Sequence, residues 1–221
     1  MLIPACALFL LATTSALAAS NRELGQYPDE PLPAAACPAT PCEAIGHVTG
    51  FLTQVGKHKN PYLVGRNGKI VAFTIRLGKP DATQTQFFAN LFGTRPSARL
   101  TILKRPKSDK RGGTQKKVLA QSEVFILTRY LGSTPTFALS KPLPISAGST
   151  VALTVPTWAP AFAVRRPADE AWRASRPKND CTGTSQAALQ TVGKVGLFDC
   201  LYQEARPIYT ATFVPDPAPT S

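Results

Sequence analysis

The stretch VAFTIRL, residues 71–77, determines the fold class that the sequence predicts. Its large apolar side chains recur at every second position: Val71, Phe73, Ile75 and Leu77. Successive side chains of an extended chain point to opposite faces, so one face of this segment meets a core while the other meets water. The spacing therefore predicts a β-strand.

The same period of two recurs along most of the chain, in the segments 98–103, 118–130, 137–139, 151–155 and 209–213. Dipeptides that favour tight turns separate these segments: Asn67-Gly68, Gly112-Gly113, Gly132-Ser133 and Ala147-Gly148. Short strands between such turns are typical of all-β proteins. We predict an antiparallel β-sandwich of jelly-roll type.

One segment has a helical spacing instead. Its apolar residues fall at positions i, i+1, i+4 and i+5, and a glycine follows: Phe87, Phe88, Leu91, Phe92 and Gly93. The pattern predicts one short helix. A helix of this length is not stable alone in water, so we expect its aromatic face to cap one end of the sandwich.

Composition limits the class of protein. The chain has 221 residues, with 25 Lys and Arg against 13 Asp and Glu, and its formal net charge is +12. A hydrophobic content of 43% excludes wholesale disorder. We expect one β-sandwich domain at 42–214, preceded by a Pro- and Ala-rich arm or linker at 20–41 and followed by a disordered tail at 215–221.

The N-terminal segment 1–19 predicts export. It carries no charge and ends in Ala16-Leu17-Ala18, the small-x-small pattern of a signal-peptidase site. No Lys or Arg precedes the apolar stretch, which is a departure from the usual signal peptide. The alternative is an uncleaved membrane anchor. We predict a cleaved signal peptide, a secreted protein and no membrane span in the processed chain.

Four cysteines remain beyond the signal segment: Cys37, Cys42, Cys181 and Cys200. An even number of cysteines in an exported chain predicts disulfides. Three connectivities are possible, and we favour Cys37 with Cys42 and Cys181 with Cys200, because each pair is local and bounded by turn-forming residues. A zinc site is the alternative, but the second pair lacks the ligand spacing of a zinc knuckle.

The most conspicuous charge feature is the segment 104–117. It has seven basic residues against one acidic residue, a net charge of +6: Lys104, Arg105, Lys107, Lys110, Arg111, Lys116 and Lys117 against Asp109. We expect a hairpin loop here that contacts an anionic polymer, either a cell-wall or extracellular polymer. The alternative is a solvated hairpin without a ligand. No aromatic residue is interleaved for base stacking, so no specific nucleic-acid recognition is predicted.

Two tryptophans are candidates for a ligand contact. Trp158 lies between Pro156 and Pro160, which we expect to end a strand and expose the loop that follows. There it would offer a flat face to a sugar ring, although a core position is the alternative. Trp172 lies next to Arg173, and stacking of a guanidinium on its indole would be a purely structural use.

No catalytic motif is present. The two histidines, His47 and His58, stand outside any known signature, and the sequence has neither a nucleophile elbow nor a phosphate-binding loop. Several acidic residues are present but cannot be placed from sequence: Glu123, Asp169, Glu170, Asp180 and Asp199. We predict no catalytic residue, metal site or cofactor.

Four motifs resemble those of a group of uncharacterised secreted actinobacterial proteins. They are QFFANLFG at 86–93, ALTVPTWAPA at 152–161, WRASR at 172–176 and CLYQEARPIYTATF at 200–213. The resemblance implies a shared fold and export, and it supports a bond between Cys181 and Cys200. It implies no activity, because none is assigned to the group.

These observations predict a secreted, non-catalytic binding protein that contacts an anionic or glycan polymer at the cell surface. Two alternatives remain open. A hydrolase acting on such a polymer would need a histidine or two carboxylates converging on a cleft. A structural envelope component would need an exposed apolar patch or a free sheet edge. The oligomeric state is left open.

Overall fold

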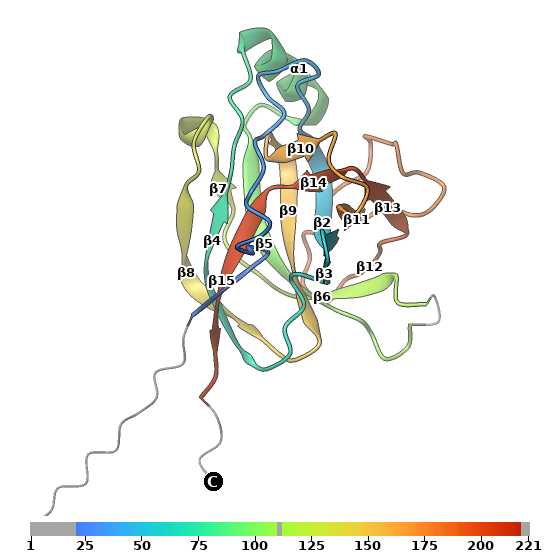
Figure 1. The fold of residues 1–221 in the computed structure, drawn as a ribbon. Coiled ribbons are helices and arrows are strands. Elements are labelled where there is room, and N and C mark those ends of the chain that lie inside the picture. Colours follow the sequence, from blue (N-terminus) through green and yellow to red (C-terminus); the bar gives the residue numbers. More distant parts are fainter. Residues whose placement is uncertain (1–20, 110–111, 218–221) are drawn as a thin grey trace, which may run out of the picture.

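Two facing antiparallel sheets dominate the structure, a computed structural model that describes residues 21–109 and 112–217 (Figure 1). The first sheet has four strands, in the order β1 (Arg22–Leu24), β15 (Tyr209–Pro215), β4 (Gly68–Ile75) and β8 (Thr136–Ile145). The second sheet has nine strands. Its main path runs through β12 (Val195–Leu197), β6 (Gln115–Gln121), β5 (Ser97–Lys104), β9 (Ser149–Ala159), β2 (Ile45–Val55), β11 (Ala171–Ala174) and β13 (Cys200–Gln203).

Smaller elements complete the fold. The strand β3 (His58–Lys59) pairs with β2, and β7 (Phe125–Ile126) pairs with β5. A separate two-stranded sheet joins β10 (Phe162–Val164) to β14 (Ala205–Pro207). The helical elements are α1 (Ala82–Phe92) and the short 3₁₀ helix η1 (Thr128–Tyr130). Within the described residues, no helix has the length and apolar character needed to cross a membrane.

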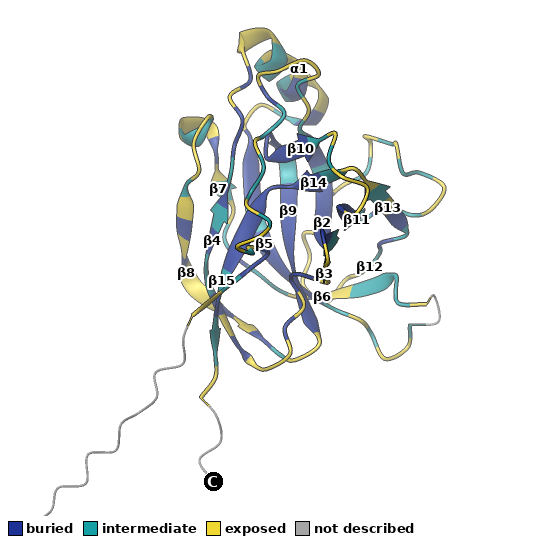
Figure 2. Ribbon diagram, viewed as in Figure 1, coloured by how far each residue is buried: buried dark blue, intermediate teal, exposed yellow. Residues whose placement is uncertain are grey.

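The main core fills the space between the two sheets (Figure 2). Leu100 of β5 and Leu153 of β9 lie on one side, and Ile70 and Phe73 of β4 lie on the other, all at most 1% exposed. Burial of one such side chain contributes about 1.5–3 kcal/mol to folding. The chain crosses between the sheets from β4 to β5 and from β8 to β9. The antiparallel sandwich of jelly-roll type predicted from the alternation is confirmed.

The register of β4 corrects one detail of the predicted alternation. Val71 was assigned to the core face, but Ile70 is the fully buried residue and Val71 is only half-buried. On β15, Thr212 pairs with Ala72 while Phe213 pairs with Ile70, so Val71 is the extra residue of a β-bulge. One inserted residue reverses the phase of the alternation.

The predicted short helix is confirmed as α1, which begins earlier than expected. Asp81 caps its first turn: the Asp81 carboxylate accepts from the Gln84 backbone N–H at 2.8 Å, and the Gln84 side chain accepts from the Asp81 N–H at 2.9 Å. This reciprocal capping box satisfies two helix-end donors. Phe88 and Phe92 are buried, whereas Phe87 is 61% exposed, so only part of the aromatic set covers the sandwich.

Residues 21–41 of the segment 20–41, which was predicted to be an arm or linker before the domain, belong to the folded body; residue 20 lies outside the described residues. Residues Arg22–Leu24 form β1, and Leu24 is buried in the main core. The ring of Tyr27 stacks on that of His58 at 3.6 Å. The prediction was wrong because a segment without periodicity is held here by contacts with strands far away in sequence.

The two chain ends are described only in part. Pro215, predicted to begin a disordered tail, ends β15, and the N–H of Asp216 donates to the carbonyl of Asn67 at 3.0 Å. The rest of that predicted tail, from residue 218, lies outside the described residues, as does the predicted signal segment 1–19.

A buried ion pair joins β14 to the loop before β11. Glu170 is 1% exposed and accepts from Nη2 of Arg166 at 2.7 Å. Arg206 of β14 is fully buried, and its Nη1 lies 3.6 Å from the Glu170 carboxylate without a hydrogen bond. The charge of Arg206 thus depends on Glu170, because a buried guanidinium without a counter-charge is costly.

We expect Glu170→Gln to lower the free energy of unfolding by about 3–5 kcal/mol, because it leaves Arg206 buried without a partner. Urea denaturation measures this change. Glu204→Gln is the matched control, since Glu204 is exposed, and it should change stability by less than about 0.5 kcal/mol. Similar values for the two variants would contradict the role assigned to Glu170.

Asp29 fastens the N-terminal segment to β3. Lys57 donates to its carboxylate at 2.7 Å, and His58 Nε2 donates at 3.0 Å. These hydrogen bonds, that from Lys57 first, lower the pKa of Asp29 from 3.8 to about 2. A carboxyl with a lowered pKa in the folded state stabilises the fold above its unfolded pKa, and this contribution is lost as the pH falls through the folded pKa.

The pKa of Asp29 is measurable by NMR titration of its carboxyl carbon. We expect a midpoint of about 2 in the wild type and a clear rise toward 3.8 in Lys57→Ala, because the largest cause of the shift is removed. A wild-type midpoint at the ordinary value of 3.8 would show that the contact does not form in solution.

Candidate binding surface

The described parts of the basic segment, 104–109 and 112–117, form the ends of two paired strands and part of the connection between them. Lys104 ends β5 and pairs with Lys117 of β6. The predicted hairpin is therefore confirmed, but Lys104, Lys116 and Lys117 lie in strands and not in the loop. Lys110 and Arg111 fall outside the described residues.

Two of the basic side chains are engaged within the fold. Lys104 Nζ donates to Ser146 Oγ at 2.9 Å and to the Ala147 carbonyl at 3.0 Å, which fixes the turn between β8 and β9. Arg105 Nε pairs with the Asp109 carboxylate at 3.0 Å. Lys107, by contrast, is exposed. The net charge of +6 is thus not wholly available to a ligand.

Strand geometry sends Lys116 and Lys117 to opposite faces of β6. Lys117 is exposed, whereas Lys116 is half-buried, with its Nζ 5.7 Å from the centre of the Phe51 ring. Burial lowers the pKa of Lys116, and the nearby charges of Arg105 and Arg173 lower it further. These three cations come from different elements: Lys116 from β6, Arg105 from the turn after β5 and Arg173 from β11.

Long-range pairing adds cations that the sequence analysis did not assign to this surface. Lys194 is exposed just before β12, and the N–H of Val118 in β6 donates to its carbonyl at 2.9 Å. Arg173 lies on β11 and donates to the carbonyl of Phe198 at 2.9 Å. No local sequence signal predicts that β12 pairs with β6, or that Arg173, on a strand paired with β2 and β13, lies close enough to Lys116 to affect its pKa. We call the set Lys107, Lys116, Lys117, Arg173 and Lys194 the basic surface.

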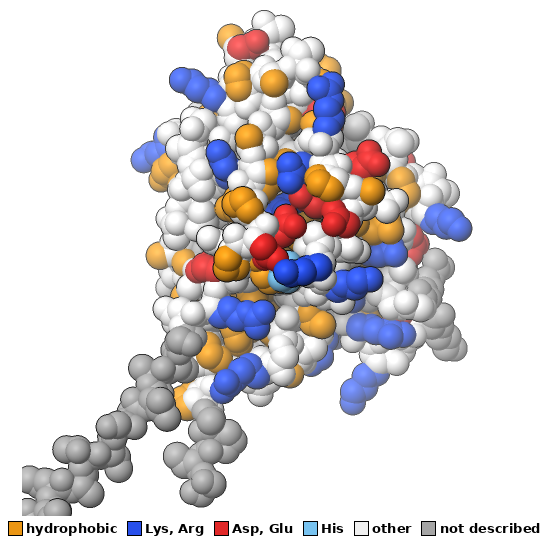
Figure 3. Space-filling model, in the orientation of Figure 1, with side chains coloured by type: hydrophobic (Ala, Val, Ile, Leu, Met, Phe, Trp, Pro, Cys, Tyr) orange, Lys and Arg blue, Asp and Glu red, His pale blue; other side chains and the backbone are white. Residues whose placement is uncertain are grey.

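In the view of Figure 3, several Lys and Arg side chains lie where Figure 1 places β6 and β12, with few Asp or Glu side chains among them. A group of Asp and Glu side chains lies nearer the centre of that view, and further Lys and Arg side chains are scattered over the face. Neighbouring cations of this kind produce a local positive potential that attracts anions.

Trp158 does not belong to any binding surface, so the expected sugar contact at this residue is wrong. The side chain is fully buried, stacks near Phe88 at 5.2 Å and donates from Nε1 to the Gly93 carbonyl at 2.9 Å. The cause is that β9 does not end at Pro156. That proline lies at an irregular step of the pairing with β2, opposite His47, where its missing N–H is tolerated.

The groups considered for catalysis are engaged in structural contacts. His47 Nε2 lies 3.0 Å from the carbonyl of Phe92, and its Nδ1 lies 3.4 Å from the carbonyl of Thr184. His58 contacts Asp29, as described above. Glu123 accepts from the backbone N–H of Ser140 at 2.7 Å. Across residues 21–109 and 112–217, no group of three or more His, Cys, Asp or Glu side chains is placed to hold a metal ion.

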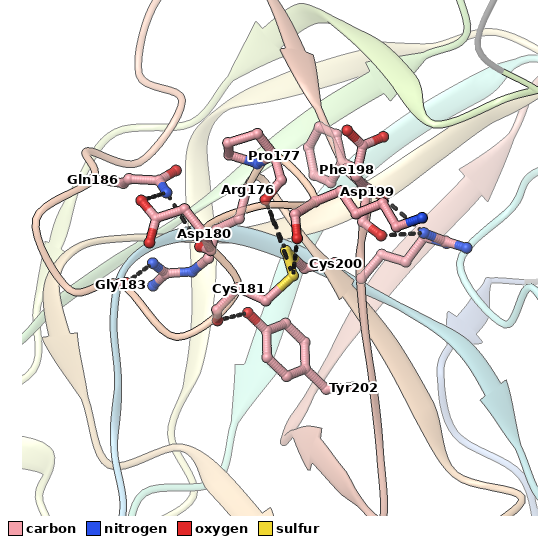
Figure 4. The surroundings of a disulfide bond; sticks show 12 residues. Arg176, Pro177, Asp180, Cys181, Gly183, Gln186, Phe198, Asp199, Cys200 and Tyr202 are labelled. Carbon is pink, nitrogen blue, oxygen red and sulfur yellow. Dashed lines mark hydrogen bonds between the residues drawn. A yellow bond between two sulfur atoms is a disulfide. The ribbon is translucent and has the colours of Figure 1, made fainter.

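Both predicted disulfides are present, Cys37–Cys42 and Cys181–Cys200. The second closes the segment that carries Lys194 and β12, and so helps to build the basic surface. Beside it, the Tyr202 hydroxyl donates to the Cys181 carbonyl, and the Gln186 amide donates to the Asp180 carbonyl at 3.2 Å (Figure 4). A covalent bond and local hydrogen bonds thus hold an irregular segment.

Comparison of the chain with known protein families, with curated proteins and with solved structures finds no match.

Replacing both cysteines of a bond by serine should destabilise the fold according to the length of the loop that the bond closes. The sequence separations are 19 for Cys181–Cys200 and 5 for Cys37–Cys42. Chain entropy gives losses of about 3 and about 2 kcal/mol, respectively. Urea denaturation of the two double variants tests the order, and a larger loss for the Cys37–Cys42 variant would contradict it.

Proposed function

We propose that this chain is an exported, non-catalytic binding protein that contacts an anionic polymer through the basic surface. Two disulfides support export, because such bonds persist in oxidising compartments. The resemblance to secreted actinobacterial proteins supports the same conclusion. The proposed ligand is a polymer that carries repeated negative charges, such as a cell-wall glycopolymer.

One observation supports this proposal above the others: cations from separate strands crowd around Lys116. Burial and the like charges of Arg105 and Arg173 all lower its pKa, and Asp109 is the acidic group that opposes them. Holding like charges together costs free energy. An anionic ligand that lies across these cations would offset that cost and be bound the more tightly at low salt.

The proposal predicts salt-dependent retention on immobilised heparin, used here as a model polyanion. The triple variant Lys107→Ser, Lys117→Ser and Lys194→Ser should elute at clearly lower salt than the wild type, because each cation that contacts the polymer contributes about one counterion to the salt dependence. All three side chains are exposed, so their removal should leave the fold intact.

The matched control removes the same charge from the first sheet and its flank, with Lys69→Ser, Lys79→Ser and Lys141→Ser, three lysines that are also exposed. It should elute close to the wild type. Equal losses in the two variants would show that net charge alone causes retention, and the basic surface would then have no special role. Retention on isolated cell wall extends the test to a polymer of the proposed class.

A further inference from the structure

A cavity of about 330 Å³ lies beside the Cys181–Cys200 bond, separate from the basic surface. The start of β2, the strands β11 and β13 and the loop 181–184 surround it. Its walls carry four aromatic rings, those of Phe92, Phe162, Trp172 and Tyr202. Small-molecule sites are typically mostly apolar cavities of this size or larger with few polar groups. We call it the disulfide cavity.

Arg176 supplies the positive charge of the disulfide cavity. It lines the cavity and is only 8% exposed, and its position beside Gly183 and Tyr202 is visible in Figure 4. Its guanidinium donates to the carbonyl of Gly183 and, at 3.3 Å, to that of Gly46. Among the described residues it forms no ion pair. Arginine is rarely buried without a counter-charge, so this cation lacks the anion that such a site normally holds.

Trp172 supplies a buried donor without a partner. The side chain is 5% exposed and lines the cavity, and its indole N–H has no hydrogen-bond partner. The Cε3–Cζ3 edge of the ring lies against Gly50, where an added Cβ would come within 2.8 Å of both atoms. The Nε1 edge is therefore turned away from β2. Tyr202 stacks on the ring at 4.7 Å and holds it in place.

The hydrogen-bond donors on the cavity wall indicate that a ligand would carry an acceptor group. Buried donors in native structures are almost always paired, yet the Trp172 indole N–H is unpaired beside a cavity that also holds the Arg176 guanidinium without an ion pair. The Tyr202 hydroxyl is already used, because it donates to the Cys181 carbonyl. An acceptor group with a single negative charge matches one guanidinium that has carbonyl partners but no counter-charge, and the aromatic walls suit a flat apolar body. The carboxylate of Glu43 also borders the cavity and offsets part of the positive charge of Arg176, which leaves no excess of charge for a polyanion.

We propose that the disulfide cavity binds a small organic carboxylate with a flat apolar body, the carboxylate accepting from Arg176 and from the indole N–H of Trp172. The site is independent of the polymer contact proposed above. Neither proposal requires the other, and the residues of the two sites do not overlap.

Calorimetric titration with phenylacetate tests the site. We expect saturable binding, with weaker binding of acetate, which lacks the apolar body, and of benzylamine, which lacks the carboxylate. Arg176→Gln should weaken phenylacetate binding by about tenfold or more, since it removes a charged donor. Trp172→Phe keeps an aromatic wall and removes only the N–H, so it should weaken binding about threefold to tenfold.

Arg129→Gln is the matched control, because it removes the same charge at an exposed residue of η1 that does not line the cavity. It should bind phenylacetate like the wild type. The triple lysine variant of the basic surface should also bind phenylacetate normally, so the two proposals fail separately. Where Arg176→Gln does not fold, Trp172→Phe decides the result. Absence of saturable binding to the wild type, or tighter binding of benzylamine than of phenylacetate, overturns the proposal.

Discussion

The structure depends on covering the outer face of the second sheet. The central strand β9 is buried from Ser149 to Val155, so core must contact both of its faces. The four-stranded sheet covers the inner face. The segment 175–199, which has little regular structure, covers the outer face, and we call this segment the cover. A second core lies under that cover, made by Phe51, Leu103, Val118, Ala152, Leu189 and Phe198. Without the cover, this apolar face would be exposed to water.

Hydroxyl groups attach the cover to the sheet. Thr154 of β9 lies 2.9 Å from Thr49 and 2.6 Å from Thr101, measured between side-chain oxygens, and all three threonines are fully buried. The N–H of Leu189 in the cover donates to the Thr49 hydroxyl at 3.1 Å, and Gln121 donates to the Leu189 carbonyl at 2.8 Å. The buried hydroxyls of Thr49, Thr101 and Thr154 thus all have partners, which avoids the cost of unpaired burial under the cover.

The sequence predicted the sandwich well because its inner face follows apolar alternation along most of each strand. The outer face was not predictable for two reasons. Thr49, Thr101 and Thr154 are polar residues of the kind that usually face water in a strand, and nothing in the neighbouring sequence shows that another segment covers them. The cover itself has no periodicity, so its place is fixed only by contacts with residues far away in sequence. The bulge at Val71 was hidden for a similar reason, since an inserted residue becomes visible only against a partner strand.

The candidate surface was predictable in charge but not in shape. The run of Lys and Arg is evident in the sequence, yet strand alternation divides Lys116 from Lys117, and pairing with β12 brings in Lys194. Trp158 was misassigned because Pro156 usually ends strand pairing, and here an irregular step in β2 accommodates it. A proline or a run of charge is visible in the local sequence. The positions of these side chains depend instead on the register between paired strands, which the local sequence does not show.

The cover links the basic surface to the disulfide cavity. Arg176 lies at the start of the cover, and Cys181 bonds the cover to Cys200 in β13. Lys194 and β12 lie near its end. An irregular segment lacks the regular backbone hydrogen bonds of a sheet. The position of the cover therefore depends on the Cys181–Cys200 disulfide, on the hydrogen bonds of Arg176 and on those of the buried threonines. A ligand between Arg176 and Trp172 would add contacts at the start of the cover. Since the same segment carries β12, these attachments also position Lys194 beside β6.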